Sequence, residues 1–302
     1  MFHLQKDSIR FYLILILELV FSPFLYLKNF VFNSISSSRP LEKRKSRKDI
    51  ETDVVYVNIH EWGGYKLERK KKISIIPEFS CGLKFQLERF NNEKQTSNIF
   101  LNVTLSDPEL HDDLDFIKSK SDCVDFVNND GMDFSGYSFF YEKIKDKKNS
   151  YVILTNSSVN SISDLFLKEY IDFMENNKQV GILGVSYCSK MIQTLIKNNF
   201  TPHLQSFFYL TTIDVLREIV EKNNGFPGKG ITHKLLLIRK GEIGVSQLVR
   251  SLGYQLAVVT EDDGVQCFGE NGFWDNGKRR WKLKMGDFRL HTQNPNRINK
   301  IS

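Results

Sequence analysis

Small polar and acidic residues follow directly after two apolar runs that have the character of buried strands. The run NNDGMDFSGY (residues 128–137) follows the apolar segment 123–127, and NSS (residues 156–158) follows the apolar segment 151–155. In an open α/β sheet, ligands bind outside the carboxyl ends of the strands, where the amides of a following helix can face an anion. Both segments are therefore candidates for holding a phosphate or a sugar. Each also fits an ordinary turn, in which Asp133 would cap the next helix.

Three further polar residues, His203, Gln205 and Glu242, are candidates for a binding or catalytic site. His203 and Gln205 alternate with apolar neighbours, so both are expected to point from one face of a strand into a cleft. Glu242 opens a helical pattern after a glycine-containing loop, where a carboxylate can act as a general base toward a hydroxyl group. The alternatives are a hydrogen-bonded structural histidine and a glutamate that interacts with the helix dipole.

These residues must be positioned by strands and helices. Apolar segments typical of strands alternate along the chain with amphipathic segments typical of helices. This alternation predicts an α/β fold with a mostly parallel sheet and helices on both faces. The expected strands are 54–59, 73–77, 98–105, 123–127, 151–155, 180–185, 204–210 and 254–259, and the expected helices are 83–90, 112–120, 134–144, 162–174, 213–221 and 242–252.

Composition limits the class of protein. The chain has 302 residues, of which 41% are hydrophobic, so it can bury a sizeable core and is not disordered, collagen-like or coiled-coil. Its 4 cysteines form no CxxC pair, which argues against a disulfide scaffold and a structural zinc site. The net charge of +6 is concentrated in the runs 39–48 and 66–72. Basic runs beside an apolar segment indicate a membrane surface rather than nucleic acid, because no alternation of basic and aromatic residues accompanies them.

The apolar segment Phe11–Phe32 is expected to attach the chain to a membrane. As a helix it would be about 33 Å long, enough to cross the bilayer core. Glu18, Pro23 and Lys28 interrupt it, so a kinked or re-entrant insertion into one leaflet is an alternative, and a buried core helix is another. The strongly basic run that follows places the rest of the chain on the cytoplasmic face.

The sequence divides into four parts. Residues 1–33 are the expected membrane anchor, 34–53 a basic linker, 54–260 the α/β domain, and 261–302 an irregular tail that packs on the domain. Two N-x-[ST] sequons begin at Asn102 and Asn156 and leave open a Golgi type II membrane protein as the alternative localisation.

Taken in chain order from about Ile73 to Val259, these segments resemble the GT-A nucleotide-sugar glycosyltransferases. They are most similar to bacterial polysaccharide enzymes of the rhamnan-synthesis type. ISIIP (73–77) resembles the first strand of that GT-A, Rossmann-like fold, and NNDGMDFSGY resembles its N-x-G-x-D turn and helix. YVILTNSSV resembles the strand that ends at the metal and sugar-phosphate site, VGILGV with HLQSFFYLTTIDVL resembles the acceptor cleft, and EIGVSQLVRSLGYQL resembles the last helix and strand.

The resemblance implies a hexosyltransferase-like enzyme of surface polysaccharide biosynthesis. It implies transfer of a sugar from a nucleotide-diphosphate donor to a glycan or lipid-linked acceptor, with inversion and with Glu242 as the base. His203 and Gln205 would line the acceptor side. The donor would be bound by Asp107 near the base or ribose, and by Asp133, Asn156, Ser157 and Ser158.

One departure from the family concerns the metal. The usual DxD motif is replaced by Asn156–Ser157–Ser158, and neutral groups are poor ligands for Mg²⁺ or Mn²⁺. Either Asp133 or His291 contributes to a metal site, or cations of the tail stabilise the diphosphate, or activity is lost and the chain is a degenerate binding or assembly subunit. The tail cations are Arg279, Arg280, Lys282 and Lys284.

Overall fold

A computed structural model describes most of the α/β domain and the start of the chain. The described residues are 2–21, 23–24, 45–73, 76–161, 165–188, 203–259, 264–268, 298, 300 and 301. The helices are α1 Phe2–Val20, α3 Leu83–Glu93, α4 Leu114–Lys120, α5 Asp133–Ile144, α6 Leu167–Asn176, α7 Ile213–Asn223, α8 Lys234–Lys240 and α9 Glu242–Ser251, with the 3₁₀ turn η1 Pro108–Leu110. The strands are β1 Val55–Trp62, β2 Arg69–Ile73, β3 Ile76–Cys81, β4 Ile99–Ser106, β5 Cys123–Val127, β6 Tyr151–Asn156, β7 Val180–Gly184, β8 Tyr187–Cys188, β9 His203–Leu204, β10 Phe208–Thr212, β11 Gln255–Val259 and β12 Val265–Phe268.

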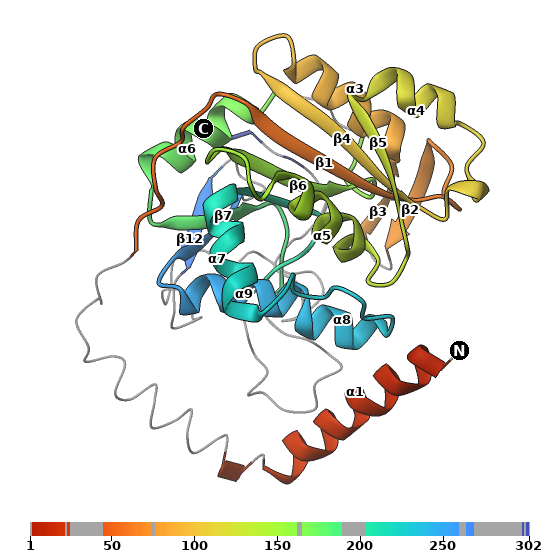
Figure 1. The fold of residues 1–302 in the computed structure, drawn as a ribbon, viewed down its shortest axis with the longest axis vertical. Helices are drawn as coiled ribbons and strands as arrows, with labels where there is room; N and C mark the ends of the chain where they lie inside the picture. The colour runs from red at the N-terminus through yellow and green to blue at the C-terminus, as the bar shows by residue number, and fades with distance from the viewer. Residues whose placement is uncertain are drawn as a thin grey trace.

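Eight strands form one mixed sheet in the order β12-β11-β7-β10-β6-β1-β4-β5 (Figure 1). Strands β1, β4, β5 and β6 pair in parallel, and β7 pairs in parallel with β11. The exceptions are β10, which is antiparallel to both of its neighbours, and β12, which is antiparallel to β11. The expected α/β class with a mostly parallel sheet is confirmed.

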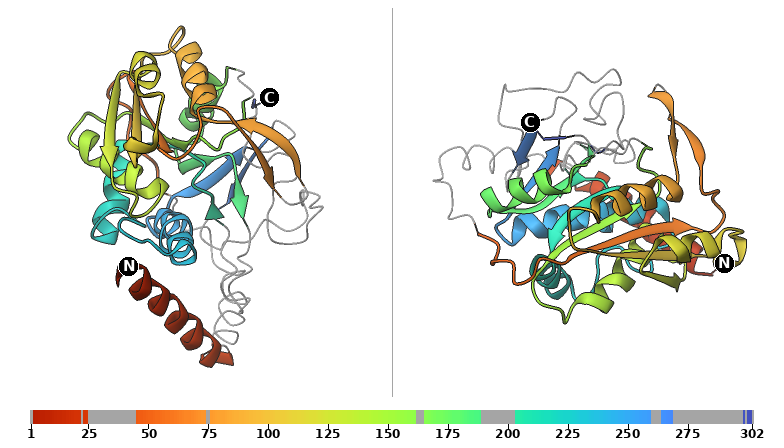
Figure 2. Two further views of the ribbon diagram at one scale, coloured as in Figure 1. Left: turned by 90° about the vertical axis from the view of Figure 1, so that its right-hand side faces the viewer. Right: turned by 90° about the horizontal axis from the view of Figure 1, so that it is seen from above.

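Helices cover both faces of this sheet because alternate strand residues point to opposite sides. Ile153 of β6 packs in a core with α3 and α6, whereas Val152 and Leu154 pack in a second core with α5, α7 and α9. Figure 2 shows α3 and α6 on one side of the sheet and α5 and α7 on the other. Nearly all of β6 is inaccessible to solvent, as expected for a strand covered on both faces.

Three expectations about elements are wrong. ISIIP is not the first strand of the main sheet, because it falls in the separate antiparallel hairpin of β2 and β3, and β1 takes that role. The expected strand 204–210 is two elements: the short β9, paired with β8 outside the main sheet, and β10. The tail after residue 261 contains the regular strand β12, which extends the main sheet at its edge beside β11.

Residues 45–53, the end of the expected linker, pack against the α/β domain. Arg47 is 4% exposed, and its guanidinium donates to the carbonyl of Val180 at 2.7 Å and to the hydroxyl of Tyr151 at 3.3 Å. This buried arginine therefore fixes the chain across β6 and β7 just before β1 begins.

Helix α1 lies beside α8 (Figure 1). Within the described part of the chain, no helix has both the length and the apolar character needed to cross a membrane, so the expected spanning helix is not supported. Most of the expected membrane segment beyond Phe24 lies outside the described residues.

Gly136 allows α5 to approach the sheet closely. A Cβ at this position would lie 2.3 Å from Thr104 Oγ1 and 2.4 Å from His60 Nδ1, closer than atoms can approach without displacement. The second glycine of NNDGMDFSGY is thus required for packing of α5 on β1 and β4, rather than for contact with a ligand.

We expect Gly136→Ala to lower the free energy of unfolding by about 1–3 kcal/mol, because the added methyl group overpacks this contact. Gly244→Ala is the matched control, since a Cβ there would meet nothing closer than the Arg239 carbonyl oxygen at 3.6 Å. Alanine should stabilise α9 by about 0.5–1 kcal/mol at that position. Urea denaturation of both variants measures the difference, and equal stabilities would contradict this account.

Candidate active site

The hydroxyl group of Ser206 joins two carboxylates at the carboxyl edge of the sheet. Ser206 Oγ lies 3.0 Å from Asp133 Oδ2 and 2.9 Å from Glu242 Oε1, and the Ser206 amide donates to the same Glu242 oxygen at 3.1 Å. Asn156 Nδ2 donates to Asp133 Oδ2 at 2.7 Å. We call Asp133, Asn156, Ser206 and Glu242 the carboxylate cluster.

Each member of the carboxylate cluster stands at the end of an element. Asp133 and Glu242 are the first residues of α5 and α9, where the positive end of the helix dipole favours a carboxylate. Asn156 ends β6, and Ser206 precedes β10. Because β10 is antiparallel to β6, the residues before β10 reach the same edge of the sheet as the residues that end β6. Asp133 is therefore not the N-cap of α5, as an ordinary turn would have it. Met132 occupies the N-cap position, and the Asp133 carboxylate belongs to the cluster.

Buried aromatic side chains support the carboxylate cluster from below. Tyr137 donates its hydroxyl to the Ser206 carbonyl at 2.6 Å, and burial together with the nearby Asp133 charge raises its pKa. Burial also lowers the pKa of His60, although the charge of Asp133 acts in the opposite direction. Both side chains are therefore neutral near pH 7, so they are polar groups near Asp133 that carry no charge of their own.

The two residues expected on the acceptor side differ in their relation to the carboxylate cluster. His203 Nε2 lies 3.9 Å from Glu242 Oε2, so this histidine belongs beside the cluster, but only 1% of its side chain is exposed. Gln205 is also buried, and its Oε1 accepts a hydrogen bond from Ser186 Oγ at 2.6 Å. His203 therefore lies beside Glu242, whereas Gln205 is held by Ser186, and the assignment of both residues to the acceptor stays a prediction.

Asp107 stands apart from the carboxylate cluster, at the ends of β4 and β1. Its Oδ2 accepts from Trp62 Nε1 at 2.7 Å and from Asn129 Nδ2 at 3.2 Å. Its backbone is left-handed, with φ of 50°. The assignment of Asp107 to the nucleotide stays a prediction.

A second cluster surrounds Ser157 and the buried carboxylate of Glu61. Ser157 Oγ donates to Glu61 Oε1 at 2.7 Å and accepts from the Arg69 guanidinium at 2.7 Å. Arg69 also donates to Glu61 at 3.2 Å and lies over the ring of Tyr65 at 4.0 Å. Burial raises the pKa of Glu61 to about 7, although Arg69 opposes this shift.

A neighbouring cation, Lys71, is close enough to Asp133 for the two charges to interact. Its Nζ lies 5.5 Å from the ring centroid of Phe207, the residue after Ser206. The ammonium group forms no ion pair or hydrogen bond with the described residues. Burial lowers the pKa of Lys71, and the charge of Asp133 partly offsets this effect. The β2–β3 hairpin therefore brings two cations to this edge of the sheet, Arg69 beside Ser157 and Lys71 beside Phe207.

The described residues contain no group of three His, Cys, Asp or Glu side chains that could hold a metal ion. Asp133, the described candidate for a metal ligand, accepts hydrogen bonds from Asn156 and Ser206. Asn156 donates a hydrogen bond to Asp133, and its Oδ1 accepts one from the Ser158 amide at 2.9 Å. The Ser157 hydroxyl is hydrogen-bonded to Glu61 and Arg69. His291 and the tail cations at 279–284 lie outside the described residues.

Sequence reasoning missed four residues that the structure brings to this edge: Ser206, Glu61, Arg69 and Lys71. Ser206 lay within an apolar run and was hidden by the expectation of one continuous strand there. Arg69 and Lys71 belong to a basic run that was interpreted only as surface charge. The charges on β2 give no signal, because residues 69–72 are all basic; only the structure separates the partly buried Arg69 and Lys71 from the exposed Lys70.

Comparisons with known proteins leave the activity open. A scan against protein-family models finds no match, and a search of the curated proteins finds none. Among solved structures, the chain is similar to a 4-diphosphocytidyl-2C-methyl-D-erythritol synthase from Anaerococcus prevotii, with a TM-score of 0.37 and 11% sequence identity. That match covers 62% of this chain and 83% of the other.

The raised pKa of Glu61 predicts a pH dependence of stability. The folded protein holds a proton that the unfolded chain releases, so the free energy of unfolding should fall as pH rises from about 4.5 to about 7. The fall should be on the order of 1–3 kcal/mol and should be smaller in Glu61→Gln, where Glu93, whose pKa burial also raises, still contributes. Urea denaturation across this pH range measures it. Glu88→Gln, at an exposed position of α3, is the control and should keep the fall, and an equal slope in Glu61→Gln would contradict the assignment.

Proposed function

We propose that this protein is a membrane-attached, inverting glycosyltransferase that moves a sugar from a nucleotide-diphosphate donor to a glycan or lipid-linked acceptor. Surface polysaccharide synthesis is the process we propose for it. The observation that carries this proposal is the carboxylate cluster, in which Asp133 and Glu242 converge on Ser206 at the carboxyl edge of a mostly parallel sheet.

Glu242 is the general base in this proposal. The Ser206 amide donates to one of its oxygens, and the Ser206 hydroxyl lies 2.9 Å from the same oxygen. Its side chain is 12% exposed, so the carboxylate is oriented and still reached by solvent. A positioned carboxylate can take the proton from an acceptor hydroxyl as that oxygen attacks the anomeric carbon. The carbon–oxygen bond to the diphosphate breaks with its electron pair leaving on the phosphate. Attack opposite the leaving group inverts the anomeric configuration.

Asp133 faces the same reacting centre. A sugar that loses its phosphate develops positive charge on the ring before the new bond is complete. Two carboxylates on one side of the ring stabilise that charge, since they are already oriented by Ser206 and Asn156 when the donor binds. Asp133 therefore acts through its charge, and Glu242 through proton transfer.

Arg69 and Lys71 would neutralise the leaving diphosphate in place of a metal ion. Arg69 already contacts Ser157 and Ser158, at 2.7 and 3.4 Å, which hold the position of the family's acidic motif. Lys71 is partly buried without an ion-pair partner among the described residues, so a bound phosphate would give its ammonium a counter-charge.

The second candidate function is a degenerate glycosyltransferase-fold subunit that binds or assembles without catalysis. The neutral Asn156–Ser157–Ser158 segment favours it, because those side chains are all committed to hydrogen bonds within the protein. Such a subunit could bind a nucleotide but would show no dependence of turnover on Glu242.

We propose the cytoplasmic face of the membrane for the domain. The Golgi alternative depended on the sequons at Asn102 and Asn156. The side chains of both are buried, with 0% and 6% exposure, and their amide nitrogens donate to Asn58 and Asp133. A glycan on either nitrogen would have no room in this fold, which favours a compartment without N-glycosylation.

Donor binding is expected to require Lys71 and to need no divalent cation. A thermal-shift screen against UDP-, GDP-, dTDP- and CMP-sugars, with Mn²⁺ and with a chelator, identifies the nucleotide. For the nucleotide found, Lys71→Met should weaken binding about tenfold or more, because one cation–phosphate contact is lost. Lys70→Met is the matched control, since Lys70 is the exposed neighbour on the same strand. Binding that requires Mn²⁺ and is unchanged in Lys71→Met would overturn the cation assignment.

Glu242→Gln should abolish most turnover while keeping donor affinity. We expect the transfer rate to fall about 10²–10⁴-fold, because glutamine keeps the size and the hydrogen-bond acceptor but cannot take the proton. Release of nucleoside diphosphate with and without acceptor measures the rate, and calorimetry with the nucleotide measures affinity. Glu221→Gln, at an exposed position of α7, is the control. Full activity in Glu242→Gln would remove the base assignment, and nucleotide binding without any turnover would favour the degenerate subunit.

A further inference from the structure

Helix α1 docks on the domain through its polar side chains. Asp7 Oδ2 accepts a hydrogen bond from the Thr232 amide at 3.0 Å, and Glu18 forms an ion pair with Arg239 of α8. Phe11 is the apolar exception, 2% exposed, with its ring 5.0 Å from the His233 ring. The face of α1 that meets the protein therefore carries both of its acidic residues.

The outward face of α1 is apolar. In a helix, residues three and four apart share a face, so the positions between the docked residues point away from the domain. The side chains on that face are each more than half exposed: Ile9, Tyr12, Leu13, Ile16, Leu17, Leu19 and Val20, followed by Phe21 and Phe24. We call these residues the apolar face of α1. Contiguous exposure of this kind marks a surface that another molecule or a membrane covers.

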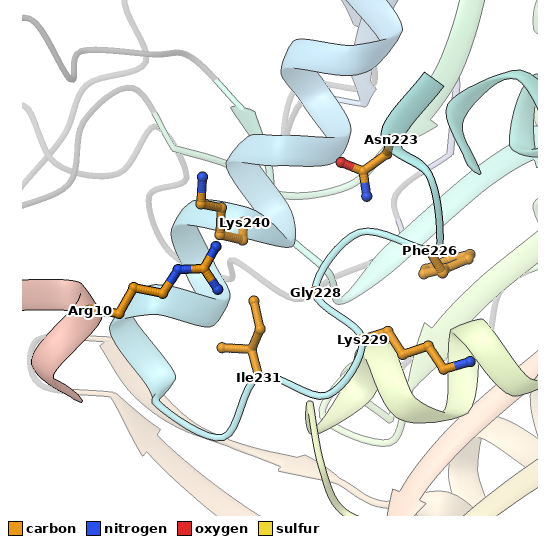
Figure 3. Close-up of a pocket in the computed structure, with 7 residues that line it drawn as sticks. All are labelled: Arg10, Asn223, Phe226, Gly228, Lys229, Ile231 and Lys240. Atoms are coloured by element: carbon orange, nitrogen blue, oxygen red, sulfur yellow. The ribbon is translucent and has the colours of Figure 1, made fainter. Parts of the chain in front are cut away.

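A basic hollow lies beside this apolar face. It has a volume of about 280 Å³ and is lined by Arg10, Asn223, Phe226, Gly228, Lys229, Ile231 and Lys240 (Figure 3). Three of the seven lining residues are cations and none is acidic. Figure 3 shows Arg10 of α1 and Lys240 at the end of α8 on the same side of the hollow. The cations are all exposed to solvent and so are available to an anion.

We propose that α1 lies flat in the surface of an anionic bilayer, with its apolar face among the acyl chains and with Arg10, Lys229 and Lys240 bound to phosphates of the lipid headgroups. An apolar helix face bordered by cations is the arrangement of helices that bind in the plane of the interface. Basic residues near the surface add attraction to anionic lipids.

Charge selects the bilayer over a second copy of the chain. A second copy of the chain would present the same cations along the border of its own apolar face, so it would offer Arg10, Lys229 and Lys240 no anionic partner there. An anionic lipid surface instead supplies the opposite charge along the same border. The inference deepens the membrane attachment within the proposed function and is independent of the transferase chemistry, so vesicle binding and sugar transfer succeed or fail separately.

The test is sedimentation of the full-length protein with vesicles of phosphatidylcholine alone and of phosphatidylcholine mixed with phosphatidylglycerol. We expect preferential binding to the anionic vesicles, weakened by added salt. Leu13→Glu with Ile16→Glu should abolish binding to both vesicles. Lys229→Gln with Lys240→Gln should reduce binding to the anionic vesicles about tenfold or more. Both pairs are exposed, and circular dichroism verifies that each variant is folded.

The matched control is Lys118→Gln with Lys120→Gln, which removes two exposed cations from α4, away from α1. This variant should bind anionic vesicles like the original protein. An equal loss in this control would show that net charge, rather than the basic hollow, attracts the vesicles, and would overturn the proposal. Absence of vesicle binding, together with a dimer in analytical ultracentrifugation that Leu13→Glu with Ile16→Glu dissociates, would assign the apolar face to a second copy.

Discussion

The proximity of two carboxylates to one serine hydroxyl is the constraint on which the candidate active site depends. Ser206 has a single hydroxyl proton, so it can donate to Asp133 or to Glu242 but not to both at once. The remaining repulsion is offset by the amino ends of α5 and α9, where both carboxylates stand, and by the Asn156 amide. The result is a local excess of negative charge that is held in place before any substrate arrives. A site of this kind favours a reacting group that becomes positive.

The reversed direction of β10 explains why much of this site was predictable and its centre was not. The polar residues after β5 and β6 could be found by looking beyond the carboxyl ends of parallel strands, and Asp133 and Asn156 do meet there. Ser206 comes before its strand, and it reaches the same edge because β10 runs antiparallel to β6. Nothing in the apolar pattern of residues 204–210 distinguishes one strand direction from the other. Strand direction is decided by pairing partners that lie far away in the sequence.

The same limit applies to the β2–β3 hairpin. The inner strands β4, β6 and β11 are buried on both faces and appear as apolar runs, so they were predicted to within two residues. The partly exposed edge strand β5 was also predicted, from its short apolar run. The hairpin lies outside that sheet and has no such pattern. Its place is set by side-chain contacts, above all Arg69 with Glu61 and Ser157, which join positions far apart in the sequence. The basic run at 66–72 was therefore interpreted as a solvated surface, although Arg69 and Lys71 on one face of β2 lie beside the site.

The docking of α1 on α8 joins the two ends of a long interval of chain. Thr232 follows Asp7 by 225 residues, and Arg239 follows Glu18 by 221 residues. During synthesis at about 5–20 residues per second, α1 emerges roughly 10–45 s before its docking surface exists. During that interval Phe11 cannot pack against His233, because that part of the domain has not yet been synthesised. Both faces of α1 are then without a partner in the domain. The order of translation thus presents this helix to other surfaces in the cell before the domain to which it belongs has folded.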